Sequence, residues 1–258
     1  MKIAIIGAGN IGSSLALGIR GKYQVVVTAK SEKTVSILRE RGFQVMKNRD
    51  AVSWADVVVL SVKPFQLRDV LRETYDLMSE KTLISVIAGV RIESLKRITG
   101  SKRVFRAMPN LGISIKKSVT ALSGDEIEEN VEEIFSMVGK TFWIDERSFD
   151  AWTALVGSGP GILAELIDGL MLGGVKAGLK PSVSLSALLD TLEVTLELLR
   201  KESPSSLRDK VATPGGTTIE AIYTMEYEKV KGGLIKAIYD ASRRSKEISE
   251  ELEMSLQH

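Results

Sequence analysis

The sequence predicts an α/β fold, in which a doubly wound parallel sheet is followed by an all-α domain. Short runs rich in valine and isoleucine alternate with helix-like segments over the first part of the chain. Runs that are apolar on both faces are typical of parallel strands covered by helices on both sides. Beyond this part only helical patterns remain. The 258 residues therefore divide into expected domains 1–146 and 147–258.

The strands and helices of the first domain follow from these alternating patterns. The expected strands are KIAIIG (2–7), YQVVVTA (23–29), FQVM (43–46), ADVVVLSV (55–62), KTLISVIA (81–88), RVFRAM (103–108), SVTALS (118–123) and KTFWI (140–144). Expected helices lie at 10–20, 31–42, 64–78 and 91–99, with an acidic helix between the last two strands. Ser31 has the side chain and position of a helix N-cap.

The second half contains helices that are apolar on almost every face. Its breaks fall at GSGPG, GLKP, SPSS and TPGGTT. Residues 162–179 and 183–199 are rich in leucine, valine and isoleucine, and helices of this kind have to be buried. A domain of about 110 residues has little interior for them, so we expect a homodimer formed through the helical domain.

Composition excludes several classes of protein. The net charge of +2 and the lack of a basic stripe argue against nucleic-acid binding. Cysteine is absent and His258 is the single histidine, so neither a catalytic triad nor a cysteine or multi-histidine metal site can form. No long apolar run is free of charge, which argues against a membrane span, and the chain begins as a strand rather than a signal peptide. We expect a cytoplasmic protein without a metal.

A glycine motif follows the first expected strand. IAIIGAGNIGSSLA places Gly7, Gly9 and Gly12 as G-x-G-x-x-G between a strand and a helix. In a Rossmann-type domain these glycines allow the tight turn, the approach of a pyrophosphate and close helix–strand packing. Asn10 and Ile11 then present backbone N–H groups at the helix N-terminus. A glycine-rich turn without function is the alternative.

The second strand indicates which dinucleotide is bound. NAD sites usually place an acid at its tip, for the ribose 2′-hydroxyl. This chain instead has Lys30, Ser31 and Lys33 around the tip. A 2′-phosphate suits these residues, so NADPH is favoured and NADH is the alternative. Both lysines could also simply face solvent.

Three further loops follow expected strands, where ligands bind in open α/β sheets. They are SVKP (61–64), IAG (87–89) and RAMPN (106–110). Each alone could be only a structural loop, but together they outline the floor of a nicotinamide pocket, and the Asn110 amide can hydrogen-bond a carboxamide. The cofactor-binding residues expected in them are Val62, Lys63, Pro64, Ala88, Gly89, Met108, Pro109 and Asn110.

A second glycine loop, LRDKVATPGGTTIEAI (207–222), precedes a helix in the second half. Backbone N–H groups of Gly215, Gly216 and Thr217 can face an anion at that helix N-terminus, and Thr213, Thr217 and Thr218 add hydroxyl groups. The loop is typical of a carboxylate-binding site in a substrate domain. A proline-initiated, threonine-capped helix start is the alternative.

Together these motifs make the chain resemble the pyrroline-5-carboxylate reductase family over essentially its whole length. The resemblance depends on GAGNIG, VKP, AG, RAMPN, VGSGP (156–160), GVKAGL (174–179) and, most specifically, the 207–222 segment. It implies a Rossmann domain, a helical dimerisation domain, and an active site at the cleft between them, completed by a neighbouring subunit. Dimers in this family often assemble into pentamers of dimers.

The resemblance also implies a reaction and residue roles. A nicotinamide cofactor delivers hydride to the C5 imine carbon of 1-pyrroline-5-carboxylate and gives L-proline. Thr213 and the backbone from Gly215 to Thr217 would hold the substrate carboxylate. Thr218 would hydrogen-bond the ring nitrogen as the catalytic residue, positioning the ring. A protonated cyclic imine is already electrophilic, so orientation suffices without a metal, nucleophile or histidine.

Three places depart from the family pattern. Leu111-Gly112 replaces Thr-Pro, Gly161-Ile162 replaces Ala-Tyr, and Ser203-Pro204 replaces His-Pro. These changes leave the reaction class unaltered but leave two alternatives open. One is a related reductase for a different cyclic imine, and the other is a protein that binds NADP(H) without turnover.

Overall fold

A computed structural model describes residues 1–256, so His258 lies outside the described residues. The chain forms two compact units. One, the sheet unit, comprises Met1–Ser158 and residues 239–256, and the other, the helical unit, is Gly159–Ile238. The end of the chain thus returns to the sheet unit. The sequence-based limits 1–146 and 147–258 stay a prediction about domains.

The sheet unit is built on eight strands, all at places the sequence predicted. They are β1 (Lys2–Ile6), β2 (Gln24–Val27), β3 (Gln44–Val45), β4 (Val57–Leu60), β5 (Thr82–Ser85), β6 (Arg103–Met108), β7 (Ser118–Ser123) and β8 (Gly139–Trp143). Their order is β3-β2-β1-β4-β5-β6-β7-β8, and all neighbours are parallel except β6 and β7. The connection 109–117 explains this exception, because a parallel crossover needs a dozen or more residues.

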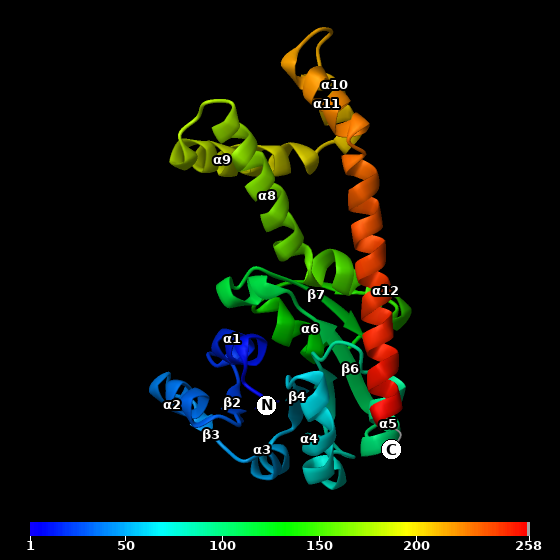
Figure 1. Ribbon diagram of the computed structural model, residues 1–258. Coiled ribbons are helices and arrows are strands. Elements are labelled where there is room, and N and C mark those ends of the chain that lie inside the picture. Colours follow the sequence, from blue (N-terminus) through cyan, green and yellow to red (C-terminus); the bar gives the residue numbers. More distant parts are fainter. Residues whose placement is uncertain (257–258) are drawn as a thin grey trace. The chain divides into compact units, whose positions relative to one another are not determined.

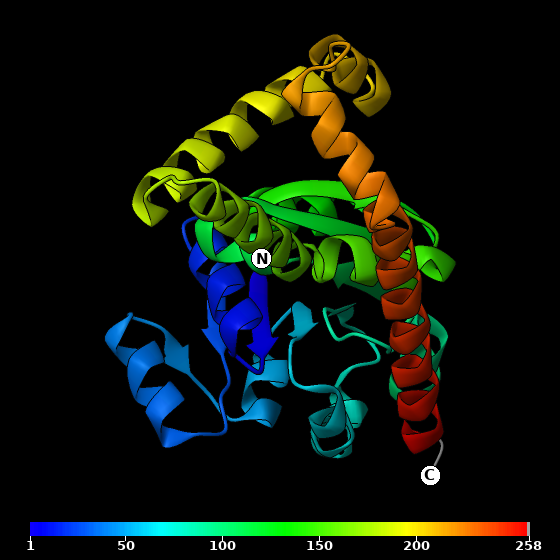
Figure 2. The ribbon, with the colours of Figure 1, turned by 45° about the horizontal axis from the view of Figure 1, so that its top comes forward.

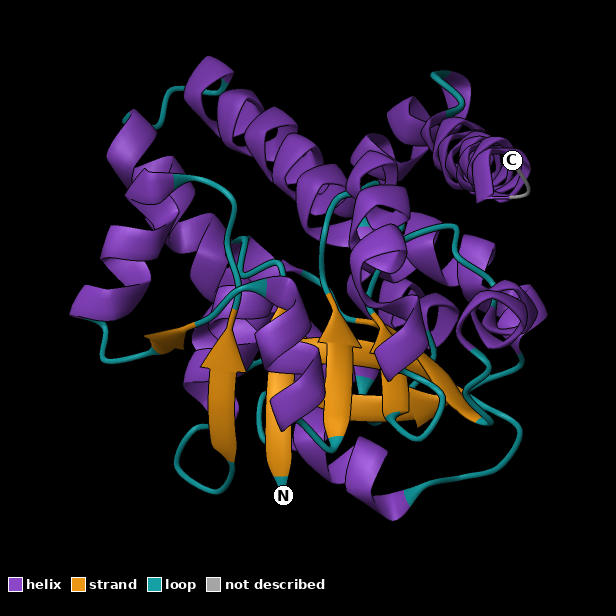
Figure 3. Cartoon of the chain, turned by 90° about the horizontal axis from the view of Figure 1, so that it is seen from below, coloured by secondary structure: helices purple, strands orange, loops and turns teal. Residues whose placement is uncertain are grey.

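Alternate strand residues enter two separate cores, as expected for strands covered on both faces. Ile3 and Ile5 pack with α1, α2 and α6, whereas Ala4 and Ile6 pack with α3, α4 and α5. Helices on both sides of the strands are visible in Figure 3. The helices are α1 (Asn10–Ile19), α2 (Glu32–Glu40), α3 (Asn48–Trp54), α4 (Leu67–Thr74), α5 (Ile92–Thr99) and α6 (Glu129–Ser136). Helix α3 was not predicted, because seven residues give too short a periodic pattern.

Short helical turns connect these elements near the ends of the strands. The 3₁₀ turns are η1 (Pro64–Gln66), η2 (Tyr75–Leu77), η3 (Leu111–Ile115) and η4 (Glu146–Ser148), and α7 (Phe149–Trp152) continues into a π-helical turn, η5 (Thr153–Gly157). Trp152, at the end of α7, donates its indole N–H to the carbonyl of Met108 at 3.1 Å. The end of β6 is thereby fixed to α7.

The second half is entirely helical, as predicted. It contains α8 (Gly159–Lys176), α9 (Pro181–Leu199), α10 (Pro204–Val211), α11 (Thr217–Tyr227) and α12 (Val230–Leu256), which are labelled in Figure 1. The α8–α9 hairpin is closed by Ser184, whose hydroxyl donates to the Met171 carbonyl at 2.8 Å. Figure 2 shows α12 as one uninterrupted helix. Its last turns belong to the sheet unit, where Leu252 is 7% exposed in the core formed with α3, α4 and α5.

Large apolar side chains of the helical unit remain uncovered in the single chain. Leu170 is 57% exposed and Val194 is 59% exposed, although patterns of this kind are typical of buried helices. By length and composition alone, the stretch Glu146–Lys176 is apolar enough to cross a membrane, a test that a core helix of a soluble protein passes as well. A second subunit packed against the helical unit would cover these exposed leucine and valine side chains.

Candidate active site

The β1–α1 turn has the geometry that its three glycines were expected to provide. Gly7 adopts φ +92°, which disfavours any residue with a side chain. A Cβ on Gly12 would lie 2.6 Å from the Gly7 carbonyl oxygen, so only glycine allows this helix–strand contact. Around Gly9, by contrast, a Cβ would meet nothing within 4 Å. The space beside Gly9 is open for a ligand.

A cavity of about 820 Å³ opens beside this turn. Six of the predicted cofactor residues line it: Gly7, Gly9, Lys30, Ser31, Val62 and Lys63. No side chain of the described residues caps α1, so the N–H groups of Asn10 and Ile11 in its first turn keep their capacity to bind an anion. An uncapped helix, an open glycine and a cavity of this size fit the phosphates of a dinucleotide.

The tip of β2 contributes polar groups with different tasks. The Ser31 hydroxyl accepts from the Thr34 N–H at 3.1 Å, which confirms the predicted N-cap of α2. Thr28 was missed from sequence: its buried hydroxyl accepts from the Gly7 N–H at 3.1 Å and fixes the glycine turn. Among residues 1–256, Lys30 and Lys33 have no ion pair, so both ammonium groups stay available to a phosphate.

A second hollow of about 980 Å³ adjoins the first and shares Thr28 and Ala29 with it. Arg39, Lys47 and Arg49 line this hollow, and sequence reasoning did not single them out. Arg49 is engaged with Asp76 through two hydrogen bonds, at 2.9 and 2.8 Å. Arg39 follows Ser31 on α2 by about two helical turns, a spacing that could have drawn attention to it.

The other predicted cofactor loops have structural tasks as well. Pro64 begins η1 after Lys63, and Ala88 packs with Met108 in a small cluster around Phe149. The structure therefore brings the 87–89 and 106–110 loops together, as expected. Pro109 is buried directly after Met108. Cofactor contact by these residues stays a prediction.

Gly89 has a structural reason of its own to be glycine. It is buried with φ +85°, and a Cβ there would lie 3.0 Å from Cα of Ser249 on α12. The close passage of α12 thus requires this glycine without any cofactor. Because Ser249 follows Gly89 by 160 residues in the chain, the sequence alone could not reveal this contact.

Asn110 is held in one orientation by the loop that follows it. Its Oδ1 accepts from the Gly112 N–H at 3.1 Å and the Val119 N–H at 3.2 Å. The carbonyl end of the amide is therefore engaged, and the Nδ2 group keeps two donors for a carbonyl oxygen. Gly112 belongs to the same arrangement, because a Cβ there would lie 2.5 Å from the Lys117 carbonyl oxygen. The Leu111-Gly112 departure thus builds a tightly packed turn.

In the helical unit, the Thr213–Thr218 loop precedes α11. Gly215 adopts φ +69°, and a Cβ on Gly216 would lie 2.4 Å from the Thr213 hydroxyl. The turn itself therefore accounts for Gly215, and a side chain at Gly216 would displace the Thr213 hydroxyl. Two features still favour binding. No side chain caps α11, and within residues 1–256 the hydroxyls of Thr213, Thr217 and Thr218 have no intramolecular partner.

The Ser203-Pro204 departure also has a local explanation. The Ser203 hydroxyl accepts from the Ser206 N–H at 3.3 Å, and Pro204 occupies the first turn of α10. This is a serine N-cap followed by proline, a strong helix start. Gly161 and Ile162 lie in the first turn of α8, where Ile162 is half-buried.

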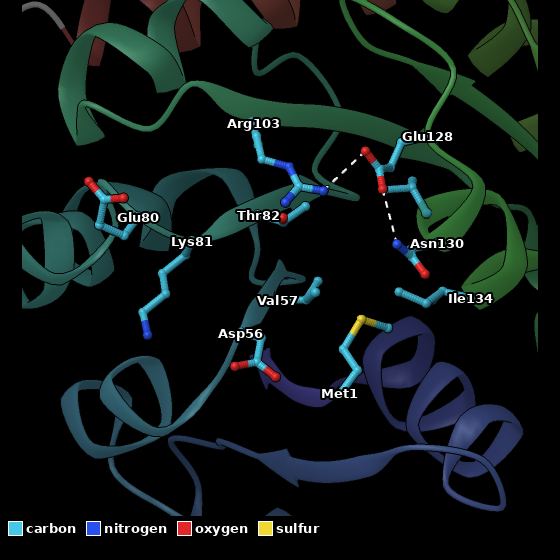
Figure 4. A pocket seen from close by; sticks show the side chains of 11 residues that line it. Met1, Asp56, Val57, Glu80, Lys81, Thr82, Arg103, Glu128, Asn130 and Ile134 are labelled. Atoms are coloured by element: carbon cyan, nitrogen blue, oxygen red, sulfur yellow. Dashed lines mark hydrogen bonds and ion pairs between the residues drawn. The ribbon is translucent and has the colours of Figure 1, made fainter.

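A smaller cavity of about 250 Å³ lies at the opposite, amino-terminal edge of the strands, between Met1, Asp56 and Lys81 (Figure 4). Most of its charged side chains are already engaged. Arg103 pairs with Glu128 at 3.0 Å, and the Lys81 ammonium donates to the Ala55 carbonyl at 2.6 Å. Ligands bind open α/β sheets at the carboxyl ends of strands, so this cavity does not compete with the glycine loop as the functional site.

Comparison with known proteins connects both halves of the chain to one enzyme family. A family model for "Pyrroline-5-carboxylate reductase dimerisation" matches residues 146–248. Another, for "NADP oxidoreductase coenzyme F420-dependent", matches residues 2–89. A pyrroline-5-carboxylate reductase of Aquifex aeolicus is 34% identical over 260 residues, covering 96% of this chain and 97% of that protein. The chain belongs to the pyrroline-5-carboxylate reductase family.

Solved structures agree with this assignment, which confirms the expectation from the motifs. A pyrroline carboxylate reductase of Plasmodium falciparum with NADP bound is 27% identical and has a TM-score of 0.86, covering 96% of this chain and 98% of its own. A 1-pyrroline-5-carboxylate reductase of Streptococcus pyogenes has a TM-score of 0.87 at the same identity and coverage. The match of residues 146–248 to a dimerisation model supports the expected homo-oligomerisation through the helical region.

Proposed function

We propose that this chain is an NAD(P)H-dependent pyrroline-5-carboxylate reductase, which reduces 1-pyrroline-5-carboxylate to L-proline in the last step of proline biosynthesis. The observation that carries the proposal is the end-to-end similarity to reductases of this name. The structure adds two uncapped helices behind glycine turns, α1 in the sheet unit and α11 in the helical unit. One suits the cofactor phosphates and the other suits the substrate carboxylate.

The reaction requires little chemistry from the side chains. A bound nicotinamide would supply a hydride to C5 of the protonated imine, with the C=N electron pair moving to the ring nitrogen. The loop from Thr213 to Thr217 holds the carboxylate through backbone N–H groups and hydroxyls. The Thr218 hydroxyl hydrogen-bonds the ring nitrogen and sets the orientation of C5. Asn110, with Nδ2 as its free end, donates to the carboxamide oxygen of the cofactor.

NADPH is the preferred cofactor in this proposal, and NADH is the weaker one. Lys30 lines the cavity at the tip of β2, Lys33 follows in the first turn of α2, and neither ammonium is paired with an acid among residues 1–256. Arg39 on the same helix adds a third cation beside the adjoining hollow. A 2′-phosphate gains from these charges, whereas a 2′-hydroxyl does not.

The assembly proposed is a homodimer through the helical unit, with pentamers of dimers as its further step, in the cytoplasm. The exposed Leu170 and Val194 belong to the surface that the dimer covers. Replacing Leu170 by Glu should shift the mass measured by light scattering toward the monomer, because a charge would be buried at the interface. An unchanged mass would place the interface elsewhere.

Loss of the reduced nicotinamide absorbance on adding 1-pyrroline-5-carboxylate tests the reaction, with NADPH and NADH run side by side. Thr218→Ala should lower turnover at least about tenfold, the scale of one orienting hydrogen bond of about 1.4 kcal/mol. Thr224→Ala is the matched control, because that hydroxyl is occupied by the Glu220 carbonyl one helical turn away. Normal kinetics in the Thr218 variant would remove its role, and an inactive wild type would refute the proposed function.

A second candidate is a reductase for another cyclic imine. The observation that favours it is Gly161-Ile162 at the start of α8, where the family pattern has Ala-Tyr. A panel of five- and six-membered cyclic imines separates the two candidates. The proposed function requires the highest kcat/KM for 1-pyrroline-5-carboxylate.

A further inference from the structure

Helix α5 is capped in an unusual way. Its first N–H groups, those of Arg91 and Ile92, donate to Glu253 at 3.1 Å and Glu146 at 2.9 Å. These carboxylates come from α12 and η4, whereas N-caps are normally supplied by the residue next to the helix. Unlike α1, α5 therefore has carboxylates of the protein itself at the start of its first turn. Its carboxylate caps instead hold the segment after β5, which carries Gly89, in a fixed place.

Arg106 joins the same cluster from the end of β6. It is 5% exposed, its Nη1 lies 3.0 Å from Oε1 of Glu146, and its guanidinium lies 4.3 Å from the ring centroid of Phe149. Burial lowers the pKa of Arg106, and the Glu146 carboxylate opposes that shift. Its Nε is the single buried side-chain nitrogen or oxygen without a partner in the part of the chain that is described. A buried, incompletely satisfied charge is costly for stability alone.

Asp150 on α7 extends the cluster to α12. Its Oδ1 accepts from the hydroxyls of Ser245 at 2.7 Å and Ser249 at 3.3 Å. Its charge also acts on Arg106. Ser249 in turn is the residue whose backbone passes closest to Gly89. The Arg106–Glu146 ion pair, the charge of Asp150 on Arg106, the Asp150–serine hydrogen bonds and the packing of Ser249 against Gly89 together connect the end of β6, α7, α12 and the loop after β5.

We propose that Arg106 is a positioning residue for hydride transfer: through Glu146 and Asp150 it fixes the two loops, at Ala88–Gly89 and Met108–Asn110, on which the nicotinamide ring rests. This inference depends on the proposed function, which assigns these loops to the nicotinamide. Arg106 lies two residues before Met108, and Glu146 binds both Arg106 and the start of α5. One carboxylate oxygen thus sets the spacing of the two loops.

The structure separates this effect from cofactor binding in general. The phosphates and the adenosine end are held by the β1–α1 turn and by β2, and neither Arg106 nor Glu146 lines the cavity there. Removing the contacts of Arg106 should therefore leave binding of the cofactor phosphates unchanged, while the nicotinamide ring loses its alignment with the imine carbon. Misalignment lowers kcat, because hydride transfer requires a defined orientation of the nicotinamide ring relative to the imine carbon.

The experiment compares Arg106→Met and Arg106→Lys with wild type. It measures kcat, the KM for NADPH, and the inhibition constant of 2′,5′-ADP, which contains the 2′-phosphate but no nicotinamide. We expect kcat to fall at least about tenfold in the Met variant, while the inhibition constant of 2′,5′-ADP stays within about twofold. Lys keeps a charge for Glu146 and should restore part of kcat. Arg147→Met is the control, since that side chain is 91% exposed and its one ion pair within residues 1–256 is with Asp145.

A second variant, at Asp150, keeps the inference testable if the Arg106 variants do not fold. Asp150→Asn keeps Arg106 and Glu146 in place but weakens the link to α12, and it should lower kcat about threefold or more with the same selectivity. Normal kcat in the folded variants, or equal losses of kcat and 2′,5′-ADP binding, would overturn the inference. The fluorescence of bound NADPH reports the ring environment without turnover. If the wild-type protein binds NADPH but does not reduce the substrate, the proposed function fails. In that case the positioning role is tested separately: it is refuted if the fluorescence of NADPH bound to Arg106→Met equals that of NADPH bound to wild type.

Discussion

The open space beside Gly9 allows a sharp test of the cofactor loop. In Gly9→Ala the new methyl group meets no protein atom within 4 Å, and the residue sits at φ −73°, a negative value that does not require glycine. Folding should therefore be almost unaffected, with a change in the free energy of unfolding below about 0.5 kcal/mol. The methyl group occupies instead the approach of the pyrophosphate to the backbone.

The expected loss of affinity follows from this displacement. Pushing the phosphates away from the N-terminus of α1 weakens charge-assisted hydrogen bonds, each of which contributes about 1.5–3 kcal/mol. The dissociation constant for NADPH should therefore rise at least about tenfold. Isothermal titration calorimetry gives this constant directly, and chemical denaturation gives the free energy of unfolding.

Gly21→Ala is the matched control for this experiment. Gly21 lies in the same unit, a Cβ added there would also meet no atom within 4 Å, and the residue does not line the cavity. This variant should change neither folding nor NADPH binding. If Gly9→Ala binds NADPH as tightly as wild type while Gly21→Ala behaves as expected, the phosphates do not rest on this loop.

Three further predictions concern the sheet unit. Gly12→Ala places a methyl group 2.6 Å from a carbonyl oxygen and should lower the free energy of unfolding by about 1–3 kcal/mol in urea titrations; an unchanged midpoint would contradict the packing argument. Replacing both Lys30 and Lys33 by Ala should raise the KM for NADPH more than that for NADH, and equal increases would count against a 2′-phosphate site. Burial and the Glu133 carboxylate raise the pKa of Tyr23 to about 12, above its ordinary value of 10.0. The neutral phenol is therefore favoured by folding, and this stability is complete below pH 10 and lost between about pH 10 and 12. Tyr23→Phe should show a shallower loss of stability across this interval, and parallel curves would refute the assignment.

The alternating pattern was enough to predict the strands because parallel strands are apolar on both faces. Ile3 to Ile6 show this directly, since alternate residues enter different cores. The antiparallel pairing of β7 was not predicted, although the short connection that causes it is visible in the sequence. Helix α3 was too short to show a period.

The site was predictable where function depends on local backbone, as in the turns around Gly9 and Gly215. It was not predictable where function depends on distant segments. Gly89 needs to be glycine because of Ser249, and Arg106 acts through Glu146 and Asp150, contacts that span from about 40 to 160 residues. Only the folded chain brings these groups together.

The most direct measurement is a crystal structure of the enzyme with NADP⁺ and L-proline. We expect the proline carboxylate against the N–H groups of Gly215 to Thr217, with the Thr218 hydroxyl at the ring nitrogen and the dinucleotide phosphates at the N-terminus of α1. A carboxylate bound away from the Thr213–Thr218 loop would contradict the proposed mechanism.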